Sequence, residues 1–251
     1  MTEIRWATFD CYGTLIDWRH GIATGIELIF PGRGRELLET FNRHEPAIQA
    51  ETPTLRYRDV LTEAFRRTAD EAGLTLLADD ADVLAASIPY WPAFDDTAAE
   101  LQRLRDAGWR LALLTNCDRD IIGAAQRRLR TPVDAIVTAE DVGAYKPDHR
   151  HFQRFAETFD TQPGNWVHVA QSYFHDMVPA AALGIPRVWV NRRAEDDDPT
   201  IADAVVADLS RLTETVIEVG DAAQRSSTIR GDAAQRSSTI GTDAAQQSST
   251  S

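Results

Sequence analysis

Hydrophobic positions along most of the chain follow two different periods. Short runs of apolar and β-branched residues, typical of strands, alternate with stretches in which apolar residues recur every three or four positions, as in amphipathic helices. The strand-like runs are Ile4–Phe9, Arg110–Leu114, Ala135–Thr138, Trp166–Ala170 and Arg187–Val190. Because parallel neighbours need long crossover connections, this alternation predicts an α/β fold with a Rossmann-like parallel sheet.

One long stretch departs from the alternation. From Trp18 to Ser87 the spacing is helical throughout, as in Leu37, Leu38 and Phe41, and no strand-like run is present. We therefore expect a helical cap domain, residues 17–90, inserted after the first strand. The core domain would then comprise residues 1–16 and 91–217.

The end of the chain repeats an 11-residue unit. Residues 220–230 recur as 231–241, and a looser third copy begins at Asp243. The units are rich in Ser, Thr, Gln and Gly, and such composition buries too little apolar surface to offset the entropy of ordering. We expect residues 218–251 to form a low-complexity, disordered tail.

Charge and composition narrow the function. The 251 residues carry a net charge of −13, which opposes binding to nucleic acid. No apolar run is long enough to span a membrane and no signal pattern opens the chain, so a cytoplasmic, soluble protein is expected. Two cysteines, Cys11 and Cys117, supply neither a disulfide framework nor zinc-ligand pairs. The acidic surface is compatible with a saline habitat or with biased base composition.

Polar side chains follow several of the predicted strands. In a parallel sheet the carboxyl ends of strands meet at one edge, where sites gather. The residues at that edge are Asp10, Thr14, Thr115, Asn116, Ser172 and Asp176. Asp10, before a Gly-Thr turn, suits a nucleophile, a metal ligand or a turn cap. Lys146 is the only lysine in the chain, which suggests that this position needs a compact point charge.

Four ordered motifs resemble those of the haloacid dehalogenase superfamily, over roughly residues 4–195. They are Phe9-Asp10-Cys11-Tyr12-Gly13-Thr14-Leu15, Leu113-Leu114-Thr115-Asn116, Tyr145-Lys146-Pro147-Asp148 and Ser172-Tyr173-Phe174-His175-Asp176. The resemblance implies a Rossmann-like core, a helical cap and an aspartate that forms a covalent intermediate. Homodimerisation is an expectation at the family level only.

Two positions indicate the subgroup. Phosphatases of the superfamily carry a second aspartate two residues after the nucleophile, which protonates the leaving alkoxide; here Tyr12 stands there. A phenol is a poor acid at neutral pH, whereas a halide leaves without a proton. Ser172 also stands where a magnesium-binding carboxylate is expected. These features, with the Phe30–Gly34 segment, are similar to the (S)-2-haloacid dehalogenases.

The resemblance implies a role for each motif residue. Asp10 attacks the halogen-bearing carbon of a small 2-haloacid, and Lys146 keeps Asp10 ionised. The amides of Cys11 and Tyr12, together with Thr115 and Asn116, hold the substrate carboxylate. Asp176 helps to activate water against the ester, supported by Thr14 and Ser172. No metal or other cofactor is required.

Other positions leave alternatives open. The cap arginine that receives halide in such enzymes aligns with Asn42, with Arg43 one residue on, and Phe152, Tyr173 and His175 also differ from the pattern. One alternative is cleavage of another carbon-centred leaving group, such as the ring nitrogen of a strained cyclic amino acid. A second is a phosphatase in which Asp10 and Asp176 bind Mg²⁺, and a third is a non-catalytic carboxylate-binding descendant.

Overall fold

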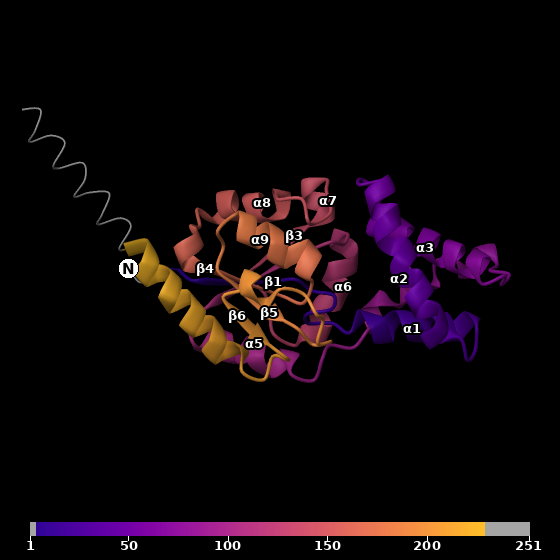
Figure 1. Ribbon diagram of the computed structural model, residues 1–251. Coiled ribbons are helices and arrows are strands. Elements are labelled where there is room, and N and C mark those ends of the chain that lie inside the picture. Colours follow the sequence, from indigo (N-terminus) through magenta and orange to yellow (C-terminus); the bar gives the residue numbers. More distant parts are fainter. Residues whose placement is uncertain (1–3, 229–251) are drawn as a thin grey trace, which may run out of the picture.

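A single six-stranded sheet forms the centre of the protein. The computed structural model describes residues 4–228. All strand pairs are parallel and the order is β3-β2-β1-β4-β5-β6. The strands are β1 Trp6–Phe9, β2 Arg110–Thr115, β3 Ala135–Thr138, β4 Trp166–Ala170, β5 Arg187–Val190 and β6 Ala204–Val206. The predicted α/β fold with a parallel sheet is confirmed (Figure 1).

Helices cover both faces of the sheet, and the side chains of β2 show the division. Leu111 and Leu113 share an apolar core with α5 (Thr97–Asp106) and α6 (Arg119–Leu129). The alternating residues Ala112 and Leu114 point to the other face, in a core with α8 (Arg150–Phe159) and α9 (Val178–Ala182). The short helix α7 (Ala139–Val142) follows β3. Because both faces are buried, β2 is a nearly continuous apolar run.

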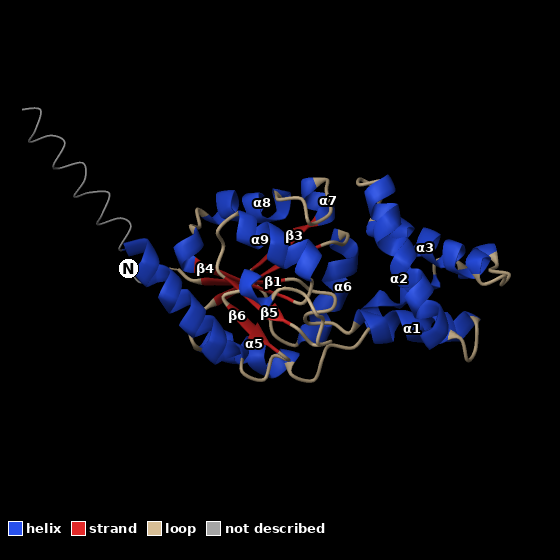
Figure 2. Cartoon of the chain, in the orientation of Figure 1, coloured by secondary structure: helices blue, strands red, loops and turns tan. Residues whose placement is uncertain are grey.

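The stretch between β1 and α5 is helical, as predicted. Its longer helices are α1 (Trp18–Ile29), α2 (Gly34–Glu51), α3 (Tyr57–Glu71) and α4 (Val83–Ser87). They lie together beside one end of the sheet, and Figure 2 shows no strand among them. Leu37, Phe41 and Val60 are buried in the same apolar core as β1. The division of the chain into core and cap domains stays a prediction.

A buried carboxylate from the sheet caps the first turn of α3. Asp118, just after β2, accepts hydrogen bonds from the backbone N–H of Tyr57 (3.0 Å to Oδ1) and Arg58 (3.1 Å to Oδ2). The Tyr145 hydroxyl donates to the Leu55 carbonyl at 2.5 Å. Helix N-termini carry unpaired N–H groups, and here a residue distant in sequence satisfies two of them. This clasp fixes the helical segment to the carboxyl edge of the sheet.

The prediction of a disordered tail from residue 218 is wrong for residues 218–228. They continue a helix over 212–228, drawn in yellow in Figure 1. Leu212, Val216 and Val219 pack at helical spacing into the core, and Glu100 Oε2 accepts bonds from the backbone N–H and hydroxyl of Thr213. Apolar anchoring thus carries the helix into the first repeat. The remainder of the predicted tail, 229–251, lies outside the described residues.

Two further differences concern short elements. Strand β6 was not predicted, because three residues at a sheet edge give no readable period. A π-helical turn, Tyr173–Met177, precedes α9 and was not predicted either. No helix within residues 4–228 has both the length and the apolar character needed to cross a bilayer.

We expect Asp118→Ala to destabilise the fold, because two N–H groups at the start of α3 lose their acceptor. The free energy of unfolding should fall by about 1–2 kcal/mol, or roughly 4 °C in melting temperature. Asp120→Ala is the matched control, since the Asp120 side chain is 54% exposed and accepts only from two surface arginines and from the adjacent backbone N–H of Ile121. Equal losses in the two variants would contradict the capping role of Asp118.

Candidate active site

Most of the polar residues singled out in the sequence meet at the carboxyl edge of the sheet. Strand β1 lies between β2 and β4, the point at which the strand order reverses and where α/β proteins bind ligands. A cavity of about 470 Å³ opens there, between the strand ends and α2. Its sheet-side wall includes Asp10, Tyr12, Thr115, Asn116, Lys146, Ser172 and Asp176.

Lys146 joins the two carboxylates. Its Nζ donates to Asp10 Oδ1 at 2.9 Å, to Asp176 Oδ1 at 2.6 Å and to the Leu114 carbonyl at 2.8 Å. The three N–H donors of the ammonium are therefore all used. The Lys146 side chain is 1% exposed, and the structure places the only lysine of the chain beneath Asp10.

The electrostatics of this cluster separate the two aspartates. Burial raises the pKa of Asp10, and the nearby charge of Asp176 adds to this against the opposing effect of Lys146. Burial also acts on Asp176, but Lys146 and a hydrogen bond from His168 outweigh it and lower the pKa of Asp176 to about 2. For Lys146, burial is overcome by the two carboxylates, which raise its pKa. Asp176 and Lys146 are therefore charged at neutral pH, and the pKa values of the two carboxyl groups are shifted in opposite directions.

A tight turn holds the other oxygen of Asp10. The Thr14 hydroxyl donates to Asp10 Oδ2 at 3.0 Å and accepts from the backbone N–H of Gln171 at 2.9 Å. Gly13 makes the turn with φ of +105°, a conformation that side chains rarely adopt. The backbone N–H groups of Cys11 and Tyr12 donate no hydrogen bond within residues 4–228. They are available to an anionic ligand, whereas the Cys11 side chain is buried in the core.

Asn116 and Thr115 are less free than the sequence suggested. Asn116 Oδ1 accepts from the Lys146 backbone N–H at 2.7 Å, and its Nδ2 donates to the Lys146 carbonyl at 3.2 Å. The Asn116 amide therefore positions the segment that carries Lys146. The Thr115 hydroxyl is directed to Cys117 Sγ at 3.5 Å. Both residues line the cavity, and direct contact with substrate stays a prediction for both.

Ser172 and Asp176 belong to the π-helical turn after β4. The Ser172 hydroxyl caps this turn by accepting from the backbone N–H of His175 at 3.1 Å, and it also lies 3.1 Å from Nδ1 of the His175 ring. Burial lowers the pKa of His175, so the ring is neutral at pH 7. Asp176 Oδ2 is buried and has no partner within residues 4–228. Single π-helical turns are frequent at functional sites.

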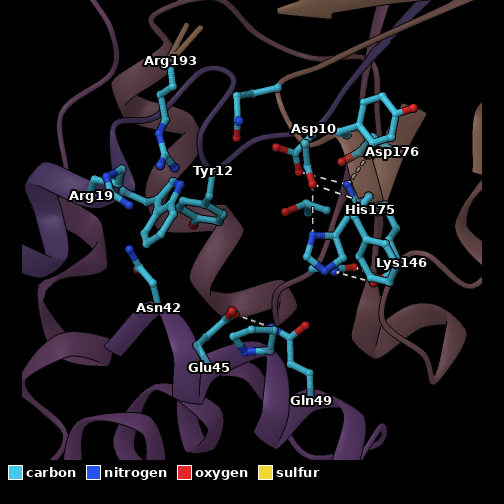
Figure 3. Close-up of a pocket in the computed structure, with 18 of the residues that line it drawn as sticks. Asp10, Tyr12, Arg19, Asn42, Glu45, Gln49, Lys146, His175, Asp176 and Arg193 are labelled. Atoms are coloured by element: carbon cyan, nitrogen blue, oxygen red, sulfur yellow. Dashed lines mark hydrogen bonds and ion pairs between the residues drawn. The ribbon is translucent and has the colours of Figure 1, made fainter. Parts of the chain in front are cut away.

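The opposite wall comes from one face of α2. Asn42, Glu45 and Gln49 line it at three- and four-residue spacing, and Arg19 and Arg193 lie at the Asn42 end (Figure 3). Arg43 does not take part, because its side chain is 60% exposed and pairs with Glu71. Of the two candidates for the leaving-group position, Asn42 is the one that faces the cavity.

Glu45 is the main surprise on this wall. It accepts a hydrogen bond from Gln49, and burial raises its pKa to about 7. Neither Glu45 nor three other residues near the site were predicted from the sequence: Arg19, Arg193 and His168. A histidine inside the apolar run Trp166–Ala170 was the one readable signal, since a buried polar side chain needs a partner.

Within the part of the chain that the structure describes, no three His, Cys, Asp or Glu side chains are grouped so as to hold a metal ion. Asp10 and Asp176 are the two carboxylates that pair with Lys146, and the ammonium lies between them. A divalent cation that used both oxygens would compete with this ammonium for the same ligand atoms.

The fold and the site together define a class of protein, parallel α/β proteins with a buried aspartate directly after the first strand. A model of the haloacid dehalogenase-like hydrolase family matches residues 4–184. The chain belongs to that family.

Similar proteins are found among curated relatives and solved structures. An (S)-2-haloacid dehalogenase of Pseudomonas sp. (strain YL) is 28% identical over 202 residues, covering 76% of this chain and 84% of the relative. One from Pseudomonas putida is 25% identical over 230 residues, covering 86% and 98%. The structure of L-2-haloacid dehalogenase from Xanthobacter autotrophicus with chloropropionic acid covalently bound superposes with a TM-score of 0.75 at 20% identity. It covers 85% of this chain and 98% of that chain, which shows that the two share a fold.

The opposite pKa shifts of the two aspartates predict opposite effects on stability. A carboxyl group with a lowered pKa stabilises the fold above the unfolded pKa, and this is lost as the pH falls towards 2. A carboxyl group with a raised pKa costs stability as the pH rises from its unfolded pKa to its folded pKa, and the full cost applies above the folded pKa. At pH 7, Asp176→Asn should therefore lower the melting temperature by roughly 5 °C, whereas Asp10→Asn should leave it unchanged or raise it. Thermal unfolding at pH 7 and pH 3 tests this, and the deficit of Asp176→Asn should shrink at pH 3. A similar loss for Asp10→Asn at pH 7 would contradict the assignment.

Proposed function

We propose that the protein hydrolyses the carbon–halogen bond of a short 2-haloalkanoic acid through an ester on Asp10. The products are a 2-hydroxy acid and halide. Two observations on relatives support this: the curated proteins from Pseudomonas are (S)-2-haloacid dehalogenases, and the Xanthobacter enzyme carries chloropropionic acid covalently bound.

Tyr12 carries the proposal. It lines the cavity two residues after Asp10, where a proton donor would have to serve an alkoxide leaving group. Burial raises the pKa of the Tyr12 phenol well above its usual range, and its hydroxyl has no partner within residues 4–228. Such a phenol keeps its proton at neutral pH. The site therefore favours a leaving group that departs as a stable anion.

In the first step a carboxylate oxygen of Asp10 attacks the halogen-bearing carbon from the side opposite the halogen, and the carbon–halogen bond breaks. Lys146 and Thr14 each hold one oxygen of Asp10 and fix its direction. The free N–H groups of Cys11 and Tyr12 receive the substrate carboxylate. Asn42 lines the far end of the cavity beside the ion pairs Arg19–Glu39 and Arg193–Glu195, and its amide N–H is the donor that would stabilise departing halide.

In the second step water adds to the carbonyl carbon of the Asp10 ester. Oδ2 of Asp176 is the free acceptor that orients this water. The proton that water gives up passes through Asp176 to the departing alkoxide, which leaves as the 2-hydroxy acid. Asp10 then loses the remaining proton to solvent and returns to the carboxylate.

Glu45 favours a second candidate, cleavage of a carbon–nitrogen bond in a strained cyclic amino acid. An amine departs only if it receives a proton. Glu45 faces the cavity and, with a pKa of about 7, holds a proton in part of the molecules at neutral pH. The nucleophile and the ester would be the same, and only the fate of the leaving group would differ.

We expect the protein to release halide from racemic 2-chloropropionate in the presence of a chelator. No more than one of the two enantiomers should be consumed completely. Asp10→Asn should abolish release, because an amide is not a nucleophile. Lys146→Ala should reduce kcat/KM by several orders of magnitude, since it removes the charge that holds Asp10 ionised. Halide release measured by ion chromatography, with p-nitrophenyl phosphate and Mg²⁺ in parallel, provides the test.

Glu45→Gln separates the two candidates. With a haloacid, this substitution should change kcat by only a few-fold, because halide needs no proton. A large loss confined to a cyclic amino acid such as azetidine-2-carboxylate would favour the second candidate. Phosphate release with Mg²⁺, with no halide from either enantiomer and no ring opening of the cyclic amino acid, would contradict both.

A further inference from the structure

A chain of buried polar side chains lies behind Asp176, inside the sheet. The Trp166 indole Nε1 donates to the Thr8 hydroxyl at 2.5 Å. The Thr8 Oγ1 lies 2.9 Å from His168 Nδ1, and His168 Nε2 lies 3.0 Å from Asp176 Oδ1. Thr8 and His168 are fully buried and Asp176 is 1% exposed. The residues come from the adjacent strands β1 and β4 and from the turn after β4.

The Trp166 indole sets the direction of all three hydrogen bonds, from Trp166 to Thr8, from Thr8 to His168 and from His168 to Asp176. An indole N–H can only donate, so Thr8 accepts from Trp166 and has one hydrogen left to give. That hydrogen points to His168 Nδ1, which is, within residues 4–228, the one other hydrogen-bond partner of the Thr8 hydroxyl. His168 Nδ1 therefore accepts, and the ring carries its proton on Nε2, directed at Asp176.

The His168 ring has little freedom to leave this position. Phe152 packs against it in a T-shaped arrangement, with ring centroids 5.0 Å apart and planes at 79°. The charged groups that face the histidine side of Asp176 are Lys146, at 2.6 Å from the same oxygen, and Asp10 beyond it. If both nitrogens of His168 carried a proton, the positive ring would lie close to the Lys146 ammonium. The hydroxyl hydrogen of Thr8 would then also have no acceptor.

The consequence is an unequal use of the two oxygens of Asp176. Oδ1 accepts from both Lys146 and His168, whereas Oδ2 has no partner within residues 4–228. Lys146 alone would hold the carboxylate at one point and leave it free to rotate about that bond. With the second donor the orientation is fixed, and Oδ2 is the oxygen left to accept from water.

We propose that His168 is a positioning residue for the second half of the reaction, holding Asp176 so that Oδ2 orients the water that hydrolyses the Asp10 ester. This inference rests on the proposed function, because it assumes the ester. It also separates the two steps: attack by Asp10 depends on Lys146 and Thr14, and hydrolysis depends on the Trp166–Thr8–His168 chain as well.

The test is rapid-quench kinetics with 2-chloropropionate, following halide release and the mass of the intact protein. In His168→Leu the rate constant for ester hydrolysis should fall by roughly 10- to 100-fold, while the rate constant for halide release changes little. One equivalent of halide should then appear in a burst, and the protein should carry the ester mass. His168→Gln should restore much of the hydrolysis, because its amide N–H can donate to Asp176.

Substitutions at Thr8 protect the test against misfolding of His168→Leu. Thr8→Val removes the hydroxyl that fixes the proton of His168 and should slow ester hydrolysis selectively, whereas Thr8→Ser keeps the hydroxyl and should behave like the wild type. ¹⁵N NMR of the histidine rings gives a readout independent of activity. The wild type should show His168 protonated on Nε2 only.

Each outcome is decisive. A folded His168→Leu or Thr8→Val variant with unchanged ester hydrolysis would overturn the role of His168 while leaving the proposed function intact. Equal loss in both steps, or His168 protonated on Nδ1, would also overturn it. Absence of halide release by the wild type would overturn the proposed function and this inference with it.

Discussion

The ammonium of Lys146, shared between two buried carboxylates, is the interaction on which the site depends. Removing charges from water costs several kcal/mol each, and a buried pair is tolerated only when its geometry and remaining hydrogen bonds are satisfied. Here Lys146 uses all three donors, Thr14 supports Asp10, and His168 supports Asp176. The two carboxylates and one ammonium carry a net charge of −1, so one ammonium cannot fully compensate the burial of both carboxylates. The carboxylate that is less well compensated is Asp10, whose pKa is raised. An arginine, planar and larger, could not make these three short contacts from one nitrogen.

The rest of the molecule holds this cluster in place and builds a cavity over it. Strands β1 and β4 supply the aspartates at the point where the strand order reverses, and Asn116 fixes the backbone of Lys146. Asp118, two residues further on, clasps the first turn of α3 and so places the helical segment over the same edge. One face of α2 forms the far wall of the cavity. At the Asn42 end of the cavity, Arg19 pairs with Glu39 and Arg193 lies 3.6 Å from Glu195, so the lining there carries charges of both signs.

The sequence predicted the sheet and the helical insertion, because the hydrophobic periods of strands and helices can be read locally. It also predicted most of the residues at the strand ends, because the carboxyl ends of parallel strands share one edge of the sheet. It did not predict what depends on packing between distant segments. The helix over 212–228 forms because Leu212, Val216 and Val219 pack into the core, although the repeat that follows is polar.

Whether Asn42 or Arg43 faces the cavity depended on the rotation of α2. Asn116 resembled a ligand donor, but its amide is used on the Lys146 backbone. Glu45 and His168 lie outside the four motifs, and only the fold brings them to the site.

The account's central claim is that Asp10 becomes an ester and is hydrolysed at its own carbonyl. A single turnover in H₂¹⁸O, with enzyme in excess over 2-chloropropionate, tests this claim most directly. The account predicts lactate whose new hydroxyl oxygen is unlabelled, together with one ¹⁸O atom in the peptide that contains Asp10. Labelled lactate from the first turnover, with no ¹⁸O in that peptide, would show direct attack by water and would contradict the covalent mechanism.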